Sequence, residues 1–217
     1  MKRLFIVALA LISAVSINAQ IAMPHTGATA FKDTSMLKPP AGAKVAIVEF
    51  EDLECPKCAY EAPIVRAAID HYQIAYLHHD FIISYHTWSR EAAITARYLQ
   101  DKVSPKISEQ FRLDIFANQK GISSKDDLVR FTLQWFRKHN LQMPFVVDPS
   151  GNCAKEVQAD CTLGEHLGVA GTPTIVVVTA HQWIEVTDVN QLYAAIDRAE
   201  SAVGATTIHA QPSVRKQ

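Results

Sequence analysis

The sequence predicts an α/β fold in which a central mixed sheet is flanked by helices. Residues 44–50 form a compact β-branched run that is typical of a buried strand, and residues 74–81 form a second strand-like run. Between these runs, apolar residues from Ala59 to Tyr72 recur at helical spacing. A strand, a helix and a strand within about 38 residues make a βαβ unit, so we expect the two strands to be parallel.

Two further strands are expected later in the chain. Residues 174–178 form another β-branched run, and residues 183–187 are its expected hairpin partner. Residues 189–201 are expected to form a closing helix, whereas residues 204–217 show no periodicity and are expected to be a flexible tail. The folded domain is therefore predicted to cover residues 44–203.

Residues 87–142 look helical throughout and are predicted to form a helical insertion between the two halves of the sheet. Aromatic and aliphatic side chains recur there at helical spacing, which indicates packing in a core. A further helix is expected to end at Gly168. Four helices are expected in this part of the chain. The first begins at Thr87 or Ser89 and ends near Lys102, and the second covers residues 104–118. The third begins at Ser124, and the fourth covers residues 152–167.

The first 19 residues are predicted to be a secretory signal. Lys2 and Arg3 give a positive start, residues 4–15 are almost wholly apolar, and Ala19 is a small residue suited to cleavage. The apolar run is shorter than the ~20 residues of a membrane-spanning helix, which argues against an anchor. No cysteine lies near the cleavage point. We therefore expect export without a lipid anchor.

Residues 20–43 are rich in small and polar residues and are expected to be an extended lead-in, with a short strand near residues 35–37. This lead-in is too short to be a separate dimerisation domain. Loss of the signal removes two of the 21 basic residues and none of the 22 acidic ones, which leaves a net charge of −3. Without basic clusters, the chain offers no electrostatic footprint for nucleic acid.

A Cys-Pro-Lys-Cys segment lies where the first strand ends and a helix can begin. Pro56 suits the first helical position, which makes Cys55 the N-cap residue, with its sulfur facing unpaired helical N–H groups. The positive end of the helix favours a thiolate, and Lys57 adds positive charge nearby. Cys58 lies one turn further in, where it is suited to resolve a mixed disulfide.

Half of a zinc site is the alternative explanation of such a motif. Cys153 and Cys161 are separated by seven residues instead of the two to four that are typical of paired zinc ligands. His78 and His79 are adjacent on an expected strand, so they point to opposite faces, and His86 follows the strand. We therefore expect no metal and no cofactor, and surface or edge positions for the histidines.

In their order and spacing, the motifs resemble the thioredoxin superfamily, and in particular its exported DsbA-like disulfide oxidoreductases, over essentially the whole mature chain. A proline follows the first cysteine, as in that branch, and Pro63 matches a proline that kinks the active-site helix. Gly171-Thr172-Pro173 resembles the cis-proline loop beside the dithiol. The resemblance implies a thioredoxin fold, with the helical block as the DsbA-type insertion.

The loop before Pro173 is expected to bind substrate. If the Thr172–Pro173 bond is cis, this loop lies against the Cys55 sulfur. The backbone of Thr172 can then pair with an extended peptide, and such main-chain pairing binds many sequences weakly. Pro56, Thr172 and Pro173 are the residues from which we expect substrate contacts.

Glu49, six residues before Cys55, occupies the place of the family's buried acid. If it is buried beside Cys58, its pKa is raised and it can exchange a proton with that thiol. A solvated acid at the end of a strand is the alternative. We therefore treat Glu49 as a candidate catalytic residue, together with Cys55, Cys58 and Lys57.

Three departures from the family pattern affect these expectations. Tyr76 stands where some relatives place a lysine near the buried acid. Glu51 and Glu54 flank Cys55 and are expected to oppose its ionisation, which partly cancels Lys57. The spacer is Pro-Lys and not the Pro-His of the best-known oxidant, so the redox potential is not carried over.

The resemblance implies a monomeric, periplasmic oxidase that introduces disulfides into unfolded or reduced secreted proteins. Its partner for re-oxidation would be a membrane quinone-linked thiol oxidase, DsbB-like or similar. A disulfide isomerase or reductase of the same fold is an alternative, because a threonine before the proline also occurs in isomerase-type relatives. A non-catalytic peptide-binding chaperone is a further alternative.

Cys153 and Cys161 leave two possibilities open. On one continuous helix, eight residues with a rise of ~1.5 Å separate their Cα atoms by about 12 Å. A disulfide requires Cα atoms within ~7 Å. A bridge therefore requires that the helix starts after Cys153 or breaks, and otherwise the two are buried free thiols.

Overall fold

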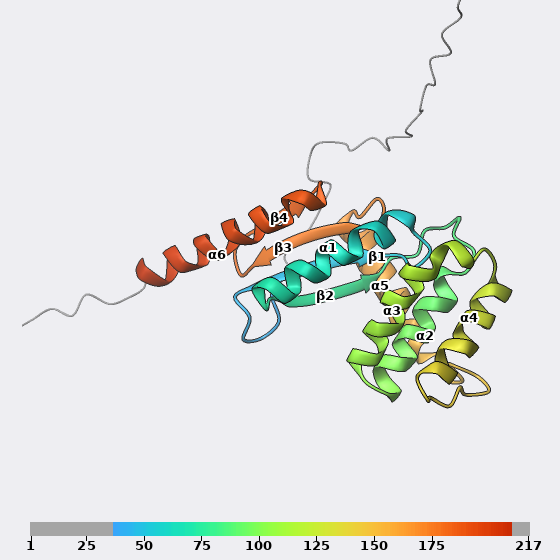
Figure 1. The fold of residues 1–217 in the computed structure, drawn as a ribbon. Helices are drawn as coiled ribbons and strands as arrows, with labels where there is room; N and C mark the ends of the chain where they lie inside the picture. Colours follow the sequence, from blue (N-terminus) through green and yellow to red (C-terminus); the bar gives the residue numbers. More distant parts are fainter. Residues whose placement is uncertain (1–36, 210–217) are drawn as a thin grey trace, which may run out of the picture.

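Four strands form one mixed sheet in the order β2-β1-β3-β4 (Figure 1). The central strand β1 (Val45–Glu51) is parallel to β2 (Ala75–Asp80) and antiparallel to β3 (Thr174–Thr179). The last strand, β4 (Trp183–Val186), pairs antiparallel with β3. Every residue of β1 is buried. The predicted fold class, the parallel βαβ unit and the C-terminal hairpin are therefore confirmed.

The computed structural model describes residues 37–209, and side chains up to residue 204. The predicted signal (1–19), most of the lead-in and residues 210–217 lie outside the described residues. So do the first two residues of the short strand expected at 35–37, and Leu37 itself is buried without being part of a strand. Within the described range, no helix combines the length and the apolar character needed to cross a membrane.

Six α-helices and two short 3₁₀ segments are found in the described range. The predicted helix bounds agree with them to within a few residues, except at the closing helix. The closing helix continues to His209. Residues 204–209 are therefore helical, whereas the sequence predicts an irregular tail there. The helices are α1 (Pro56–Tyr72), α2 (Ser89–Lys102), α3 (Pro105–Asn118), α4 (Lys125–Lys138), α5 (Asn152–Leu167) and α6 (Leu192–His209), with 3₁₀ segments at Gln119–Gly121 and Val189–Gln191.

The sheet is covered on both faces. Helices α1 and α6 pack on one face, where Val45 and Ile47 of β1 join Val65 of α1 and Ile196 of α6. Helix α5 covers the opposite face, on which Phe50 lies. Because side chains alternate along a strand, Glu49 and Glu51 continue the row of Val45 and Ile47 on the face that α1 covers. This alternation brings two carboxylates under the first turns of α1.

The helical insertion packs at one end of the sheet. Figure 1 shows α2, α3 and α4 together beyond that end, with α6 extending at the opposite end. A second core fills the insertion and includes Cys58 and Ala62 of α1 together with Phe111 of α3 and Trp135 of α4. The start of α1 therefore lies at the boundary between the sheet layers and the insertion.

Candidate active site

The Cys-Pro-Lys-Cys segment begins helix α1, as predicted. Cys55 is the N-cap residue with extended backbone angles (φ −74°, ψ 119°), and Pro56 is the first helical residue. The Cys55 amide donates to the Asp52 carbonyl at 3.0 Å. Gln119 of the insertion donates through Nε2 to the carbonyl oxygens of Leu53 (2.9 Å) and Cys55 (3.1 Å). Sequence analysis missed Gln119, because no local pattern links it to a loop more than 60 residues earlier.

The Cys55 thiol lies against the loop before Pro173. The Thr172–Pro173 bond is cis, as expected, and Cys55 Sγ donates to the Thr172 carbonyl at 3.3 Å. The residue is only 7% exposed. The Thr172 hydroxyl is buried without a hydrogen-bond partner, so it is free to donate to a thiolate once Cys55 loses its proton. Two segments separated by 117 positions thus meet at one sulfur atom.

The surroundings of Cys55 favour its ionised form. A hydrogen bond from Cys58 is the main cause that lowers the pKa of Cys55 to about 6, although burial opposes it. The Thr172 side chain and the backbone N–H groups of Cys58 and Lys57 lower it further. At neutral pH, Cys55 is therefore mostly a thiolate, which is the reactive form of a cysteine.

Cys58 has the opposite character. It is almost completely buried, and burial raises its pKa well above the ordinary value. Its hydrogen bond to Cys55, and the charges of Cys55 and Glu49, raise the pKa further. Environments that push the pKa values of two neighbouring groups apart assign them different chemical roles. Here they favour Cys55 as the nucleophile and Cys58 as its protonated partner.

Glu49 is buried, so the alternative of a solvated acid at a strand end is wrong. The residue is 2% exposed, and burial, followed by the charge of Glu51, raises its pKa to about 8. The Tyr76 hydroxyl donates to Glu49 Oε2 at 2.8 Å and acts in the opposite direction. A carboxyl with such a pKa is present in both protonation states near neutral pH, as a proton carrier beside Cys58 requires.

The charge of Lys57 is compensated within α1. Its side chain is 47% exposed, and its ammonium lies 3.5 Å from the buried carboxylate of Glu61, one turn further along. Burial raises the pKa of Glu61, Lys57 lowers it, and the charge of Cys55 raises it further. The backbone N–H of Lys57 lowers the pKa of Cys55. The expected effect of the Lys57 ammonium on Cys55 stays a prediction. Glu61 was missed, although the spacing of four residues from Lys57 is a usable signal.

Glu51 and Glu54 have partners other than Cys55. The expectation that their charges oppose the ionisation of Cys55 stays a prediction. Glu54 Oε2 accepts hydrogen bonds from the backbone N–H groups of Trp88 (2.7 Å) and Ser89 (3.1 Å) at the start of α2. Glu51 Oε1 lies 2.9 Å from Nη1 of Arg112 on α3. Both carboxylates therefore attach the insertion to the loop that carries the dithiol.

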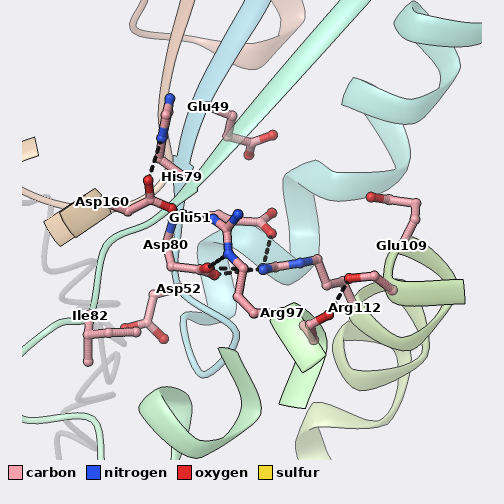
Figure 2. Close-up of polar contacts among 12 residues, drawn as sticks. Glu49, Glu51, Asp52, His79, Asp80, Ile82, Arg97, Glu109, Arg112 and Asp160 are labelled. Carbon is pink, nitrogen blue, oxygen red and sulfur yellow. Dashed lines mark hydrogen bonds and ion pairs between the residues drawn. The ribbon is translucent and has the colours of Figure 1, made fainter. Parts of the chain in front are cut away.

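A buried ionic network connects the insertion to the ends of β1 and β2 (Figure 2). Arg112 contacts Glu51 and also Asp80, at 2.8 Å through Nη1 and 3.1 Å through Nη2. Burial alone would raise the pKa of Asp80, but Arg112 and Arg97 lower it well below its ordinary value. Arg97 of α2 binds Asp80 (2.8 Å) and Asp160 of α5. One buried cluster thus joins α2, α3 and α5 to the strand ends.

The histidines lie on or after the edge strand β2, as expected, and each has a structural environment. Burial holds the pKa of His78 well below its ordinary value. His79 stacks on Phe50, with ring centroids 5.0 Å apart, and His86 Nδ1 lies 2.9 Å from Asp52 Oδ2. Among the side chains that the structure describes, no group of three or more His, Cys, Asp or Glu is arranged to hold a metal ion.

Cys153 and Cys161 are free thiols in the structure. Both lie within the continuous helix α5, so neither condition for a bridge between them is met. Cys161 Sγ donates to the Asp80 carbonyl at 3.5 Å and accepts from the Ile82 amide at 3.5 Å. Its contacts are those of a small buried core residue.

We expect alkylation of Cys55 in the reduced protein to rise with pH around a midpoint near 6, measured as the rate of iodoacetamide labelling. Replacing Cys58 with alanine removes the leading hydrogen-bond donor and is expected to raise this midpoint. Because the folded-state pKa is lowered from 9.0 to about 6, the reduced protein gains stability as pH rises from about 6 to 9. It loses this stability as pH falls through about 6. A midpoint near 8.5, the value of an ordinary thiol, would contradict the assignment.

Comparisons with known proteins agree with this geometry. A family model described as thioredoxin matches residues 34–198. The thiol–disulfide exchange protein alpha-DsbA2 of Wolbachia pipientis is similar, with a TM-score of 0.60 and 18% identity over 74% of this chain and 84% of that one. DsbA2 of Pseudomonas aeruginosa has a TM-score of 0.56 and 17% identity over 74% of this chain and 91% of that one.

A thioredoxin-like oxidoreductase of Silicibacter pomeroyi is also similar, with a TM-score of 0.59 and 23% identity over 73% of this chain and 88% of that one. No curated protein sequence matches the chain significantly. At these identities the solved structures establish the fold, which is thioredoxin-like and shared with DsbA-type thiol–disulfide exchange proteins. Because the family model covers most of its length, the chain belongs to the thioredoxin family.

Proposed function

We propose that this protein is an exported thiol–disulfide oxidoreductase that introduces disulfides into secreted proteins through Cys55 and Cys58. The observation that carries the proposal is the pair of opposed thiols at the start of α1, one favoured as a thiolate and the other held protonated. Such a pair stabilises the reduced form of the enzyme, and a stable reduced form makes the oxidised form a good oxidant.

The proposed reaction begins with oxidised enzyme. A substrate thiolate attacks Cys55 Sγ, the Cys55–Cys58 bond breaks, and the Cys58 sulfur leaves and takes a proton from Glu49. A second substrate thiolate then attacks the substrate sulfur of the mixed disulfide and releases Cys55 as a thiolate. The substrate dithiol has lost two electrons, and the enzyme now holds one thiolate and one thiol.

Substrate is proposed to bind along the Thr172–Pro173 loop and Pro56. This loop lies against the Cys55 sulfur, so a peptide paired with its backbone would bring its own cysteine to the same place. Re-oxidation is assigned to a membrane quinone-linked thiol oxidase, and the protein is proposed to act as a monomer in the periplasm. The resemblance to DsbA-type proteins and the signal-like first 19 residues support these assignments.

The equilibrium of the Cys55–Cys58 couple with glutathione tests the proposal. Ionisation of Cys55 at pH 7 stabilises the reduced form by about 1.4 kcal/mol, which corresponds to about 30 mV for a two-electron couple. We expect the potential of the couple to be less negative than about −180 to −210 mV, which is the potential of the glutathione pool in the endoplasmic reticulum. A potential near about −270 mV, as in thioredoxin, would exclude an oxidase and favour a reductase. An isomerase remains the second candidate, because of Thr172 before the cis-proline.

A further inference from the structure

Tyr76, the hydrogen-bond partner of Glu49, has the cation of Arg66 packed on its ring. The Tyr76 hydroxyl, from the edge strand β2, donates to Glu49 Oε2 at 2.8 Å. The Arg66 guanidinium of α1 lies over the Tyr76 ring, with its Cζ atom 4.3 Å from the ring centroid. Arg66 Nη2 is in turn 2.7 Å from Glu109 Oε1 on α3. The contacts therefore run without a gap from the buried acid to a partly exposed ion pair.

This arrangement keeps Tyr76 a hydrogen-bond donor. Burial, and then the charge of Glu49, raise the pKa of Tyr76 well above its ordinary value, so the hydroxyl retains its proton. A cation over the face of a phenol ring is attracted by the ring and draws electron density from it, which strengthens donation by the hydroxyl. Burial and Glu51 raise the pKa of Glu49, and Tyr76 and Arg66 oppose them.

We propose that Tyr76, polarised by Arg66, is a positioning residue that holds the Glu49 carboxylate ready to accept the proton of Cys58. The inference rests on the proposed function, in which Glu49 and Cys58 exchange a proton. In this step a thiol compound, called the guest, is bound to Cys55 in a mixed disulfide. The S–H bond of Cys58 breaks as its proton passes to a Glu49 oxygen. The Cys58 sulfur then attacks Cys55, forms the Cys55–Cys58 bond and releases the guest as a thiolate.

Several other ionisable groups face Glu49, so the effect of Tyr76 has to be separated from theirs. A change that removes only the Tyr76 hydroxyl leaves all of them in place. A matched control exists at the far end of α1, where the Tyr72 hydroxyl donates to Asp197 Oδ1 at 2.6 Å. The other groups that face Glu49 are Glu51 on β1, His78 on β2, Cys58, Glu61 and Arg66 on α1, and Glu109 next to Arg66.

The test uses Tyr76→Phe in the full-length protein. Cys55 is first converted to its mixed disulfide with glutathione, and the release of glutathione by Cys58 is followed between pH 5 and 10. We expect the midpoint of the pH profile to rise by about one unit, which slows release at pH 7 about tenfold. The carboxyl ¹³C resonance of Glu49, assigned with Glu49→Gln, is expected to titrate with the same shift. Above the new midpoint, the rate is expected to return to that of the unaltered protein.

The outcomes separate this inference from the proposed function. If Glu49→Gln slows release but Tyr76→Phe leaves both the profile and the resonance unchanged, the role of Tyr76 is refuted and that of Glu49 stands. If Glu49→Gln itself releases glutathione at the normal rate, the proton exchange in the proposed function fails. Tyr72→Phe is expected to change neither readout, and an equal shift in that control would refute a local effect of Tyr76.

Arg66→Met tests whether the cation acts through Tyr76. We expect a smaller shift of the midpoint in the same direction. Arg66 also lowers the pKa of Glu49 directly by its charge. The effect of Arg66→Met is therefore expected to be smaller, but not zero, in the Tyr76→Phe background. If the effect of Arg66→Met persists in full in the Tyr76→Phe background, Arg66 acts on Glu49 only directly and the polarising role is refuted.

Discussion

Replacing Cys55 with serine is expected to abolish thiol–disulfide exchange, whereas replacing Cys58 with serine is expected to trap a mixed disulfide. In the Cys58→Ser protein, the Cys55 thiolate attacks glutathione disulfide, and glutathione thiolate leaves. The product persists because the resolving sulfur is absent. In the Cys55→Ser protein, Cys58 is the thiol of the dithiol that remains, and burial, the leading cause of its raised pKa, is expected to persist. Even the pKa of an ordinary thiol, about 8.5, leaves only about 3% thiolate at pH 7, so the reaction is expected to slow by more than about thirtyfold.

Mass spectrometry of the intact protein after incubation with glutathione disulfide measures both results. Cys58→Ser is expected to gain the mass of one glutathione, and Cys55→Ser is expected to gain none. Cys161→Ser is the matched control, because that buried thiol lies in α5 and has no contact with the dithiol among its hydrogen bonds. It is expected to exchange like the unaltered protein. An adduct on Cys55→Ser that forms as fast as on Cys58→Ser would reverse the roles of the two thiols. Full substrate handling by Cys55→Ser would instead favour a chaperone.

Replacing Arg112 with methionine is expected to destabilise the protein by about 3–5 kcal/mol, because it leaves the buried Glu51 carboxylate without its cation and the buried Asp80 carboxylate with Arg97 alone. Arg112 is 1% exposed and binds both Glu51 and Asp80 (Figure 2). The exposed Arg130, which pairs with Asp127 on the surface of α4, provides the control. Its replacement by methionine is expected to change stability by no more than ~1 kcal/mol. Urea unfolding of the reduced proteins at pH 7 measures the difference.

The pH dependence of the Arg112 variant gives a second check. In the unaltered protein the pKa of Asp80 is lowered, so its contribution to stability is present above the unfolded-state pKa and is lost as pH falls through the folded value. Burial already raises the pKa of Glu51, and Arg112 opposes it. Without Arg112 the pKa values of Glu51 and Asp80 shift upward, and stability is lost as pH rises through the shifted values. The difference in the free energy of unfolding between the unaltered protein and the Arg112 variant should therefore become smaller from pH 7 to pH 4. If this difference in unfolding free energy becomes larger towards acid pH, the buried charge is not the cause of the lost stability.

Features that depend on neighbours in the chain could be predicted from the sequence. The N-cap position of Cys55 follows from Pro56 at the first helical position, and the strand at residues 44–50 follows from its run of β-branched residues. The contact between Cys55 and the loop before Pro173 was expected only through a family resemblance, because 117 positions separate the two partners.

The end of α6 was placed too early for a different reason. The apolar pattern fades after Ser201, but the helix continues to His209, because a helix propagates through its own backbone hydrogen bonds once it has begun. The Lys57–Glu61 pair could have been found from its spacing of four residues, because the helix was already expected to begin at Pro56. That Glu61 is buried, however, depends on the packing around α1.

By itself, the sequence determined the local order of this protein: which runs are strands, where the dithiol helix begins, and which thiol faces its positive end. Only the tertiary structure decided the partner of each charge. Glu51 and Glu49 lie on the same face of β1, yet the first binds Arg112 and the second accepts from Tyr76. The reason is physical: secondary structure follows from interactions between chain neighbours, whereas desolvation and charge pairing depend on segments that meet only when the chain folds.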